Sequence, residues 1–263
     1  MLSYQHIYHA GNLADVHKHS MLAWALAYMT RKDKPLTYLE THAGRGLYDL
    51  QDEAALKTGE AAKGIALVKD AFATDHPYAQ VLSRIQSKHG ASAYPGSPLI
   101  AAESLRNIDT VHLSELHQQE FAALKENMGP YGGIYRQKDG WEMAMSLCPP
   151  EPRRGLLLID PSFEVKSDYQ TIPQTIAKLH RKWGVGVIML WYPILTDAPH
   201  IPMIRELQAA LPDAVTHEVS FPPARPGHRM VGSGLFVVNA PYGFTDEAAR
   251  LSALFQDRLS HLM

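Results

Sequence analysis

The sequence predicts an α/β fold with a mostly parallel, doubly wound sheet, and two observations support this prediction. From about residue 98 onward, segments of helical and strand character alternate regularly, which is typical of a parallel sheet with helices on both faces. Several predicted strands also end at an acidic residue, and ligands bind at the carboxyl ends of strands in such sheets. A chain of 263 residues suits one large domain, so we expect a single domain over 1–263.

The first part of the chain predicts a helix, a strand and an inserted helical piece. Residues 15–30 have apolar side chains at helical spacing after a polar arm, so we expect an amphipathic helix with Asp15 as a candidate cap. Residues 36–40 predict a short strand. From about 51 to 92 the sequence is polar and helix-prone without a clear strand, and we interpret it as an inserted helical subdomain.

The rest of the chain predicts six more strands separated by helices. The expected strands cover 110–114, 133–137, 155–159, 186–191, 214–220 and 234–239, and the expected helices cover 98–105, 118–127, 141–147, 169–183, 200–211 and 246–261. The last two strands follow each other across a loop rich in proline and glycine, so we expect one antiparallel strand. Together with the first strand, the sheet would have seven strands.

Composition and charge exclude several classes of protein. The formal net charge of −2, from 25 basic and 27 acidic residues, argues against bulk electrostatic coating of nucleic acid. Cys148, the single cysteine, excludes an internal disulfide framework and fits a reducing compartment. The start has no signal-peptide pattern, and no apolar run is long enough to span a bilayer. We therefore expect a cytoplasmic protein with no membrane partner.

The segment 155–163 is the most informative in the chain, because an apolar strand ends there at Asp160, Pro161, Ser162 and Phe163. A transferase that holds a planar base by its exocyclic amine needs this order. The acid accepts one N–H, the carbonyl of Pro161 accepts the other, and the ring of Phe163 stacks on the base. The amine lone pair then points at an electrophilic methyl group. The plainer interpretation is a buried strand whose aspartate caps the next helix.

Three further acids, Glu40, Glu115 and Asp139, follow predicted strands and are therefore expected at the same edge of the sheet as the strand-end aspartate at 160. A glycine-bearing turn that includes Gly44 follows the first strand and would let the backbone approach a ligand closely. The third glycine of a dinucleotide motif is absent, since Asp49 stands there, and no P-loop motif occurs.

A ligand with an amino acid and a nucleoside but no phosphate fits this pattern, and S-adenosylmethionine is such a ligand. Gly44 would lie under its methionine part. Glu115 would bind the ribose hydroxyls, and Asp139 would accept a hydrogen bond from the adenine amine. Strand-end acids also serve as helix caps, so the assignment depends on their joint order.

Eight motifs along the chain carry a more specific signal. They are His9-Ala10-Gly11-Asn12 with Ala14-Asp15-Val16 and Lys18-His19, Thr41-His42-Ala43-Gly44, Tyr94-Pro95-Gly96-Ser97-Pro98, Leu113-x-Glu115-Leu116-His117, Lys138-Asp139-Gly140, Leu158-Ile159-Asp160-Pro161, Leu190-Trp191-Tyr192-Pro193 and Gly232-Ser233-Gly234. These motifs closely resemble the bacterial large-subunit ribosomal RNA adenine-N6 methyltransferase J family. The match runs over essentially the whole chain.

The resemblance implies a Rossmann-like class I S-adenosylmethionine-dependent methyltransferase that modifies one adenine of naked or partly assembled 23S rRNA. Carried over by position, the cofactor shell consists of His19, His42, Ser97, Glu115, Asp139, Gly140 and Asp160. Tyr4, His6 and Lys18 stand where the N-terminal arm of the family meets the substrate and shapes the site, and we count Lys18 among the catalytic residues. We expect a monomer that needs no metal.

One departure from the family concerns the catalytic strand end. The family has Asp-Pro-Pro-Tyr, whereas this chain has Ser162 and Phe163 at the last two positions. Phe163 keeps the stacking face and lacks only the hydroxyl. Ser162 frees a φ angle that proline would fix, which would loosen the carbonyl acceptor at Pro161. We expect slower or less stringent chemistry.

Several alternatives remain beside this hypothesis. A metal site from His6, His9, His17 and His19 is disfavoured because their spacing is loose and no cysteine joins them. Trp191 is interpreted as core and pocket wall. The enzyme could instead methylate adenine in DNA, since the motif recognises an amine and a ring. A non-catalytic protein of external DNA use, with a vestigial cofactor pocket, is the alternative from another class.

Overall fold

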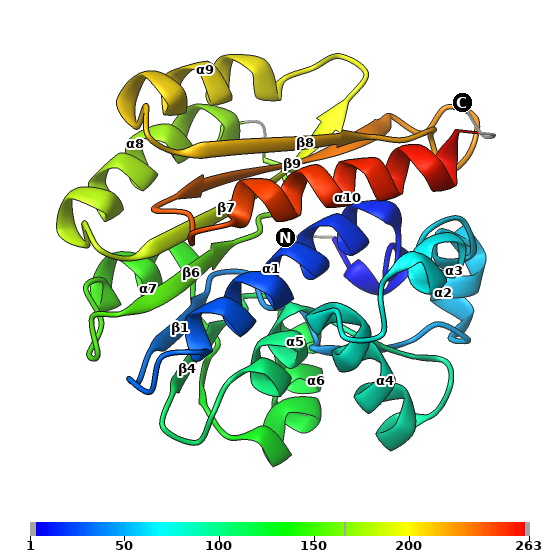
Figure 1. Ribbon diagram of the computed structural model, residues 1–263, viewed down its shortest axis with the longest axis horizontal. Helices are drawn as coiled ribbons and strands as arrows, with labels where there is room; N and C mark the ends of the chain where they lie inside the picture. The colour runs from blue at the N-terminus through cyan, green and yellow to red at the C-terminus, as the bar shows by residue number, and fades with distance from the viewer. Residues whose placement is uncertain (1–3, 166, 261–263) are drawn as a thin grey trace.

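The computed structural model describes residues 4–165 and 167–260 and is built on a seven-stranded sheet (Figure 1). The strands are β1 (Thr37–Glu40), β4 (Thr110–Ser114), β5 (Ile134–Arg136), β6 (Gly155–Ile159), β7 (Val187–Leu195), β8 (Val215–Ser220) and β9 (Met230–Val238). Their order is β5-β4-β1-β6-β7-β9-β8. The first five pair in parallel, and β9 runs antiparallel to β7 and to β8. The predicted fold class is confirmed.

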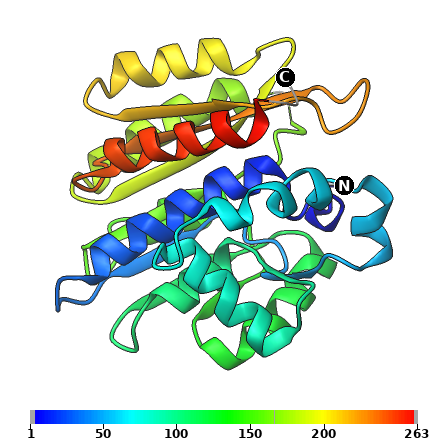
Figure 2. The same cartoon turned by 45° about the vertical axis from the view of Figure 1, so that its right-hand side comes forward.

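Helices cover both faces of the sheet (Figures 1 and 2). They are α1 (Leu13–Thr30), α5 (Ser97–Ser104), α6 (Gln118–Met128), α7 (Gly140–Leu147), α8 (Asp168–Lys182), α9 (His200–Ala210) and α10 (Phe244–Leu259). Side chains of β6 alternate between the two cores, as the period of a strand requires. Leu156 and Leu158 pack in the core that includes α1 and α10, and Leu157 and Ile159 pack in the core that includes α7, α8 and α9.

Between β1 and α5 the chain forms short helices and a small second sheet. The helices include α2 (Glu53–Thr58), α3 (Ile65–Val68) and α4 (Pro77–His89), and strands β2 (Leu47–Asp49) and β3 (Ala93–Pro95) pair antiparallel. Figure 2 shows α2 and α3 beside the N-terminal segment. The sequence did not predict β2 and β3, because three residues are too few to show a period of two. The description of 51–92 as a separate helical subdomain stays a prediction.

Helix α1 differs from the expected amphipathic helix, because it is buried on nearly all sides between the sheet and its neighbouring helices. The cap was also predicted wrongly. The side-chain oxygen of Asn12 accepts a hydrogen bond from the backbone N–H of Asp15 at 2.8 Å, so Asn12 is the N-cap. The polar residues of α1 that are buried must therefore find partners inside the protein. They are Asp15, His17, Lys18, His19 and Ser20.

Strands β7 and β9 are longer than predicted because they pair antiparallel from Ile188 and Val238 to Leu195 and Met230. The extension carries residues of both strands to the edge of the sheet where the candidate site lies. The predicted end of the last helix at 261 lies outside the described residues. None of the helices within residues 4–165 and 167–260 combines the length and the apolar composition of a membrane span.

Candidate active site

A cavity of about 440 Å³ lies at the carboxyl ends of β1, β4, β6 and β7. All but two of the predicted site residues line this cavity. The residues that line it are Tyr4, His6, Lys18, His19, His42, Gly44, Ser97, Glu115, Asp160, Pro161 and Phe163. The two exceptions are Asp139 and Gly140. The cavity thus brings together residues from the N-terminal arm, from α1 and from the turns that follow three different strands.

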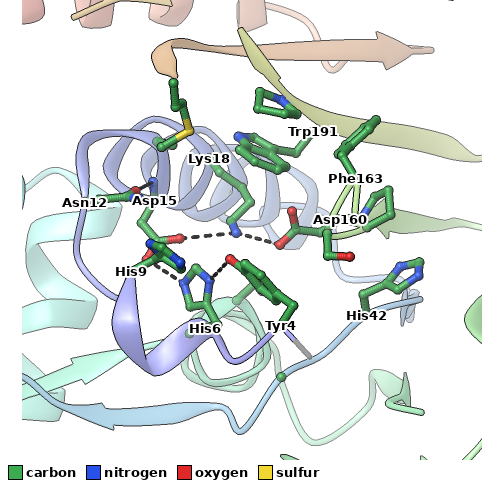
Figure 3. Close-up of a pocket in the computed structure, with 18 of the residues that line it drawn as sticks. Tyr4, His6, His9, Asn12, Asp15, Lys18, His42, Asp160, Phe163 and Trp191 are labelled. Carbon is green, nitrogen blue, oxygen red and sulfur yellow. Dashed lines mark hydrogen bonds and ion pairs between the residues drawn. The ribbon is translucent and has the colours of Figure 1, made fainter. Parts of the chain in front are cut away.

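The predicted catalytic acid is paired with the predicted catalytic lysine (Figure 3). Nζ of Lys18 lies 2.6 Å from Oδ2 of Asp160 and 3.3 Å from Oδ1 of Asp15. Burial alone would lower the pKa of Lys18, but the carboxylates of Asp160 and Asp15 outweigh it and hold the pKa above its usual value. Lys18 therefore stays an ammonium ion between two carboxylates.

Asp15 is a buried hub that the sequence analysis considered only as a cap. Its Oδ2 accepts hydrogen bonds from Nε2 of His6 at 2.8 Å and from the backbone N–H of Gly11 at 2.9 Å. Burial raises the pKa of Asp15, but His6, His19 and Lys18 outweigh it and leave the pKa well below its usual value. The signal that could have found this role is the i, i+3, i+4 spacing of Asp15, Lys18 and His19 on one helix.

The N-terminal arm continues this network (Figure 3). The hydroxyl of Tyr4 lies 2.8 Å from Nδ1 of His6, and the ring of Tyr4 stacks on that of His9 at 5.6 Å. Nδ1 of His9 in turn lies 3.0 Å from Oε1 of Glu60. If the phenol donates to Nδ1 of His6, Nε2 of His6 carries the proton that Asp15 accepts. Hydrogen bonds and ion pairs then run without a break from Tyr4 through His6, Asp15 and Lys18 to Asp160.

The opposite side of the cavity is formed by the turn after β1 and by Glu115. Its Oε2 accepts the backbone N–H of Gly44 at 2.8 Å, and its Oε1 accepts that of His117 at 2.8 Å. Gly44 has a φ of +60°, and a Cβ there would lie 2.6 Å from the hydroxyl of Tyr48, so this position favours glycine. Burial lowers the pKa of His42 to about 4, which keeps its ring neutral.

Ser97 reaches the cavity, but Glu40 lies behind it. The hydroxyl of Ser97 donates to Oε1 of Glu40 at 2.5 Å, and the hydroxyl of Tyr38 donates to Oε2 at 2.9 Å. Glu40 is fully buried and does not line the cavity. Burial raises its pKa to about 8. The strand-end acid nearest the glycine turn is therefore a supporting group beneath Ser97.

Asp139 and Gly140 lie outside the lining of the cavity, at the start of α7. Oδ1 of Asp139 accepts the backbone N–H of Glu142 at 3.0 Å, which makes Asp139 the N-cap. A Cβ on Gly140 would lie 2.0 Å from the carbonyl oxygen of Thr41, so only glycine permits this close approach of α7 to the turn after β1. The assignment of Asp139 to the adenine amine stays a prediction.

Aromatic rings form the wall next to Asp160. Phe163 has a φ of +53°, which is unusual for a bulky residue and common at functional turns. Its ring centroid lies 4.8 Å from that of Tyr169 and 6.0 Å from that of Trp191. Trp191 lines the cavity, which agrees with its interpretation as pocket wall.

Among the histidines near the N-terminus, His6 and His19 both face Asp15. In residues 4–165 and 167–260, no group of three or more His, Cys, Asp and Glu side chains is placed to hold a metal ion. His6 pairs with Asp15, whereas His17 is bonded to Ser233 and to His217 on the other side of α1.

Comparisons with known proteins identify the family. A family model described as "Ribosomal RNA large subunit methyltransferase D, RlmJ" matches residues 33–262. "Ribosomal RNA large subunit methyltransferase J" of Escherichia coli (strain K12) is 37% identical over 247 residues, which cover 92% of this chain and 88% of that protein. The protein of the same name from Haemophilus influenzae is 34% identical over 248 residues, with the same coverage of both chains.

A solved structure agrees with these relatives. The crystal structure of a Legionella pneumophila protein is similar with a TM-score of 0.87 and 36% identity, covering 95% of this chain and 94% of that one. The family resemblance expected from the motifs is thus confirmed, and the chain belongs to the ribosomal RNA large subunit methyltransferase J (RlmJ) family.

Proposed function

We propose that this protein transfers a methyl group from S-adenosylmethionine to the exocyclic amine of an adenine in 23S rRNA. The observation that carries the proposal is the position of Asp160, at the end of β6, on the wall of a cavity of about 440 Å³. The two relatives above are named as ribosomal RNA methyltransferases, which supports an rRNA substrate.

The residues present fit S-adenosylmethionine, which supplies an electrophilic methyl group on a sulfonium when bound. Glu115 uses one lone pair on each oxygen for the backbone N–H groups of Gly44 and His117. A carboxylate has about four such positions, so Glu115 can also accept two ribose hydroxyls. The neutral ring of His42 and the hydroxyl of Ser97 add polar contacts that place no further positive charge in the cavity.

The other half of the site orients the base. Lys18 engages Oδ2 of Asp160, which fixes the carboxylate while leaving lone pairs free to accept an N–H of the target amine. The carbonyl of Pro161 is the second acceptor, and Phe163 supplies the stacking surface. As the N–C bond forms and the C–S bond breaks, the amine loses one proton, and the Asp160 carboxylate is the acceptor already hydrogen-bonded to it.

The target adenine must leave its stack to reach this cavity. Unstacking a base costs a few kcal/mol, and this cost is smallest where the RNA is unpaired. We therefore infer that naked or partly assembled 23S rRNA is the substrate. We further infer that the enzyme acts in the cytoplasm, where this RNA is available, and as a monomer.

The test is methylation of protein-free 23S rRNA by the purified protein with S-adenosylmethionine, followed by mapping of N6-methyladenine. We expect one modified adenine, and competition with adenine-containing DNA should leave the rRNA signal unchanged. Preferential methylation of DNA would contradict the rRNA substrate. Calorimetry that detects no binding of S-adenosylmethionine would instead favour a non-catalytic protein with a vestigial pocket.

A further inference from the structure

A chain of hydrogen bonds leads from the cavity wall through the core and is not used by the chemistry proposed above. It begins at Nε1 of Trp191, which donates to Oγ of Ser233 at 2.9 Å. Oγ of Ser233 lies 2.8 Å from Nδ1 of His17, and Nε2 of His17 lies 2.9 Å from Nδ1 of His217. The chain ends at Ser252 on α10, whose Oγ lies 2.8 Å from Nε2 of His217.

Two orders of protons give every hydrogen bond in this series one donor and one acceptor. An indole N–H can only donate, so Ser233 accepts from Trp191. A hydroxyl can accept twice, so in one order Nδ1 of His17 also donates to Ser233, Nδ1 of His217 donates to His17, and Ser252 donates to His217. In the other order, Ser233 donates its hydroxyl proton to Nδ1 of His17. Nε2 of His17 then donates to His217, and Nε2 of His217 donates to Ser252. Both orders require both imidazoles to be neutral. Burial lowers the pKa of His17 and of His217, which agrees with this requirement.

The sheet explains why Ser233 reaches the indole. On β9, Ser233 is paired with Pro193 of β7. Side chains two residues apart on a strand point to the same face, so Ser233 lies diagonally across from Trp191. Ser233 and His17 are fully buried. A rotated indole would lose this acceptor for its N–H, so the hydrogen bond to Ser233 favours one orientation of the ring.

The face of the fixed indole is directed at the catalytic pair. Nζ of Lys18 lies 5.5 Å from the ring centroid of Trp191, a cation–π arrangement, and 2.6 Å from Asp160. Figure 3 shows the Lys18 ammonium between Asp15 and Asp160, with Trp191 next to the Lys18 side chain. Because His17 and Lys18 are consecutive residues of α1, the same helix holds the far side of the indole and presents the ammonium to its face.

We propose that His17 and Ser233 are positioning residues for methyl transfer. They fix the indole of Trp191, which bounds the target-base site beside Phe163 and holds the Lys18 ammonium against Asp160. The role of the indole as a boundary of the target-base site rests on the proposed function, since it needs a base in the cavity. Its contact with the Lys18 ammonium concerns the protein alone.

The test compares Ser233→Ala with the control Ser104→Ala, which removes a half-buried hydroxyl that donates to the carbonyl of Ile100 within α5. Misplacement of catalytic groups costs on the order of tenfold or more in rate, so kcat of Ser233→Ala should fall about tenfold. The Kd of S-adenosylmethionine should stay unchanged in both variants. Equal kcat values for Ser233→Ala and Ser104→Ala would overturn the proposal.

A double-mutant cycle tests whether Ser233 acts through Trp191. If it does, Ser233→Ala combined with Trp191→Phe should be no slower than Trp191→Phe alone, whereas independent effects would multiply. Losses of kcat that multiply in the double variant would mean that Ser233 does not act through Trp191.

A readout without RNA separates this inference from the proposed function. The protein has four tryptophans, and the indole ¹⁵N–¹H signal missing from Trp191→Phe belongs to Trp191. That signal should shift in Ser233→Ala and stay in place in Ser104→Ala. A wild-type protein that does not methylate 23S rRNA would count against the proposed function alone. The indole signal then decides the positioning role, and a signal unmoved in Ser233→Ala refutes it.

Discussion

The ammonium of Lys18 lies 2.6 Å from Oδ2 of Asp160, although the two residues are 142 positions apart in the sequence. Helix α1 carries the lysine and the end of β6 carries the aspartate, so the ion pair ties the N-terminal part of the chain to the strand that defines the site. The pair is largely buried, with side chains 5% and 14% exposed. Its removal should therefore affect both the geometry of the carboxylate and its charge balance.

Lys18→Met should reduce kcat for RNA methylation strongly. Methionine keeps most of the volume but leaves the carboxylates of Asp15 and Asp160 without their shared ammonium, and loss of a preorganised electrostatic contact costs about 100-fold in kcat. Lys18→Arg keeps the charge and should retain more activity. Steady-state kinetics of both variants checks this, and equal activities in Lys18→Met and wild type would show that the ion pair is not needed.

Glu40→Gln should change how stability depends on pH. Burial raises the pKa of Glu40 from 4.5 to about 8, so the folded protein holds this proton more tightly than the unfolded chain does. This contribution to stability is complete below pH 4.5 and is lost as the pH rises through about 8.

The variant lacks this titration, so its free energy of unfolding relative to that of wild type should rise between these pH values, by a few kcal/mol in order of magnitude. Urea unfolding of both proteins at about pH 5, 7 and 9 measures this difference in the free energy of unfolding. A difference that does not change with pH would mean that Glu40 is ionised in the folded protein.

Glu115→Gln should weaken the binding of S-adenosylmethionine by about tenfold, because the amide nitrogen cannot accept the backbone N–H of Gly44 or His117 and offers fewer acceptors to ribose hydroxyls. Isothermal titration calorimetry measures the Kd. Glu142→Gln is the matched control, since Glu142 is 67% exposed and pairs with Lys138. Similar Kd values for the two variants would exclude Glu115 from the cofactor site.

Ser162→Pro should raise kcat several-fold, because a fixed φ at 162 would steady the carbonyl of Pro161, which we propose as the second acceptor of the target amine. Phe163→Tyr restores the other residue of the family pattern and should change kcat little, since the stacking face is the same. Initial rates on 23S rRNA test both. A Ser162→Pro variant slower than wild type would show that this loop needs its present freedom.

The fold was predictable because its evidence is local. The apolar run at 155–159 and the acid at 160 mark a buried strand and its end, and both are where the sequence placed them. The burial of α1 was not predictable, because it depends on which helices cover it. Glu40 shows the same limit, since strand-end position alone cannot tell a side chain that faces the cavity from one buried behind Ser97.

The candidate site was predictable where a motif or the family resemblance named its residues, such as Lys18, His42 and Asp160. Asp15 as a hub and Ser233 as a partner of His17 were missed. Ser233 and His17 are separated by 216 positions, so no spacing rule connects them, and only the pairing of β9 with β7 under α1 brings them together.

The most direct test of the account is the single-turnover rate of methyl transfer to 23S rRNA by Asp160→Asn, with the Kd of S-adenosylmethionine measured in parallel. Asparagine replaces one acceptor oxygen with an amide that donates hydrogen bonds, and it removes one of the two carboxylates that flank the Lys18 ammonium. The rate should fall at least about 100-fold, and the variant should still bind the cofactor. A rate close to that of wild type would contradict the role of Asp160 as the acceptor of the adenine amine.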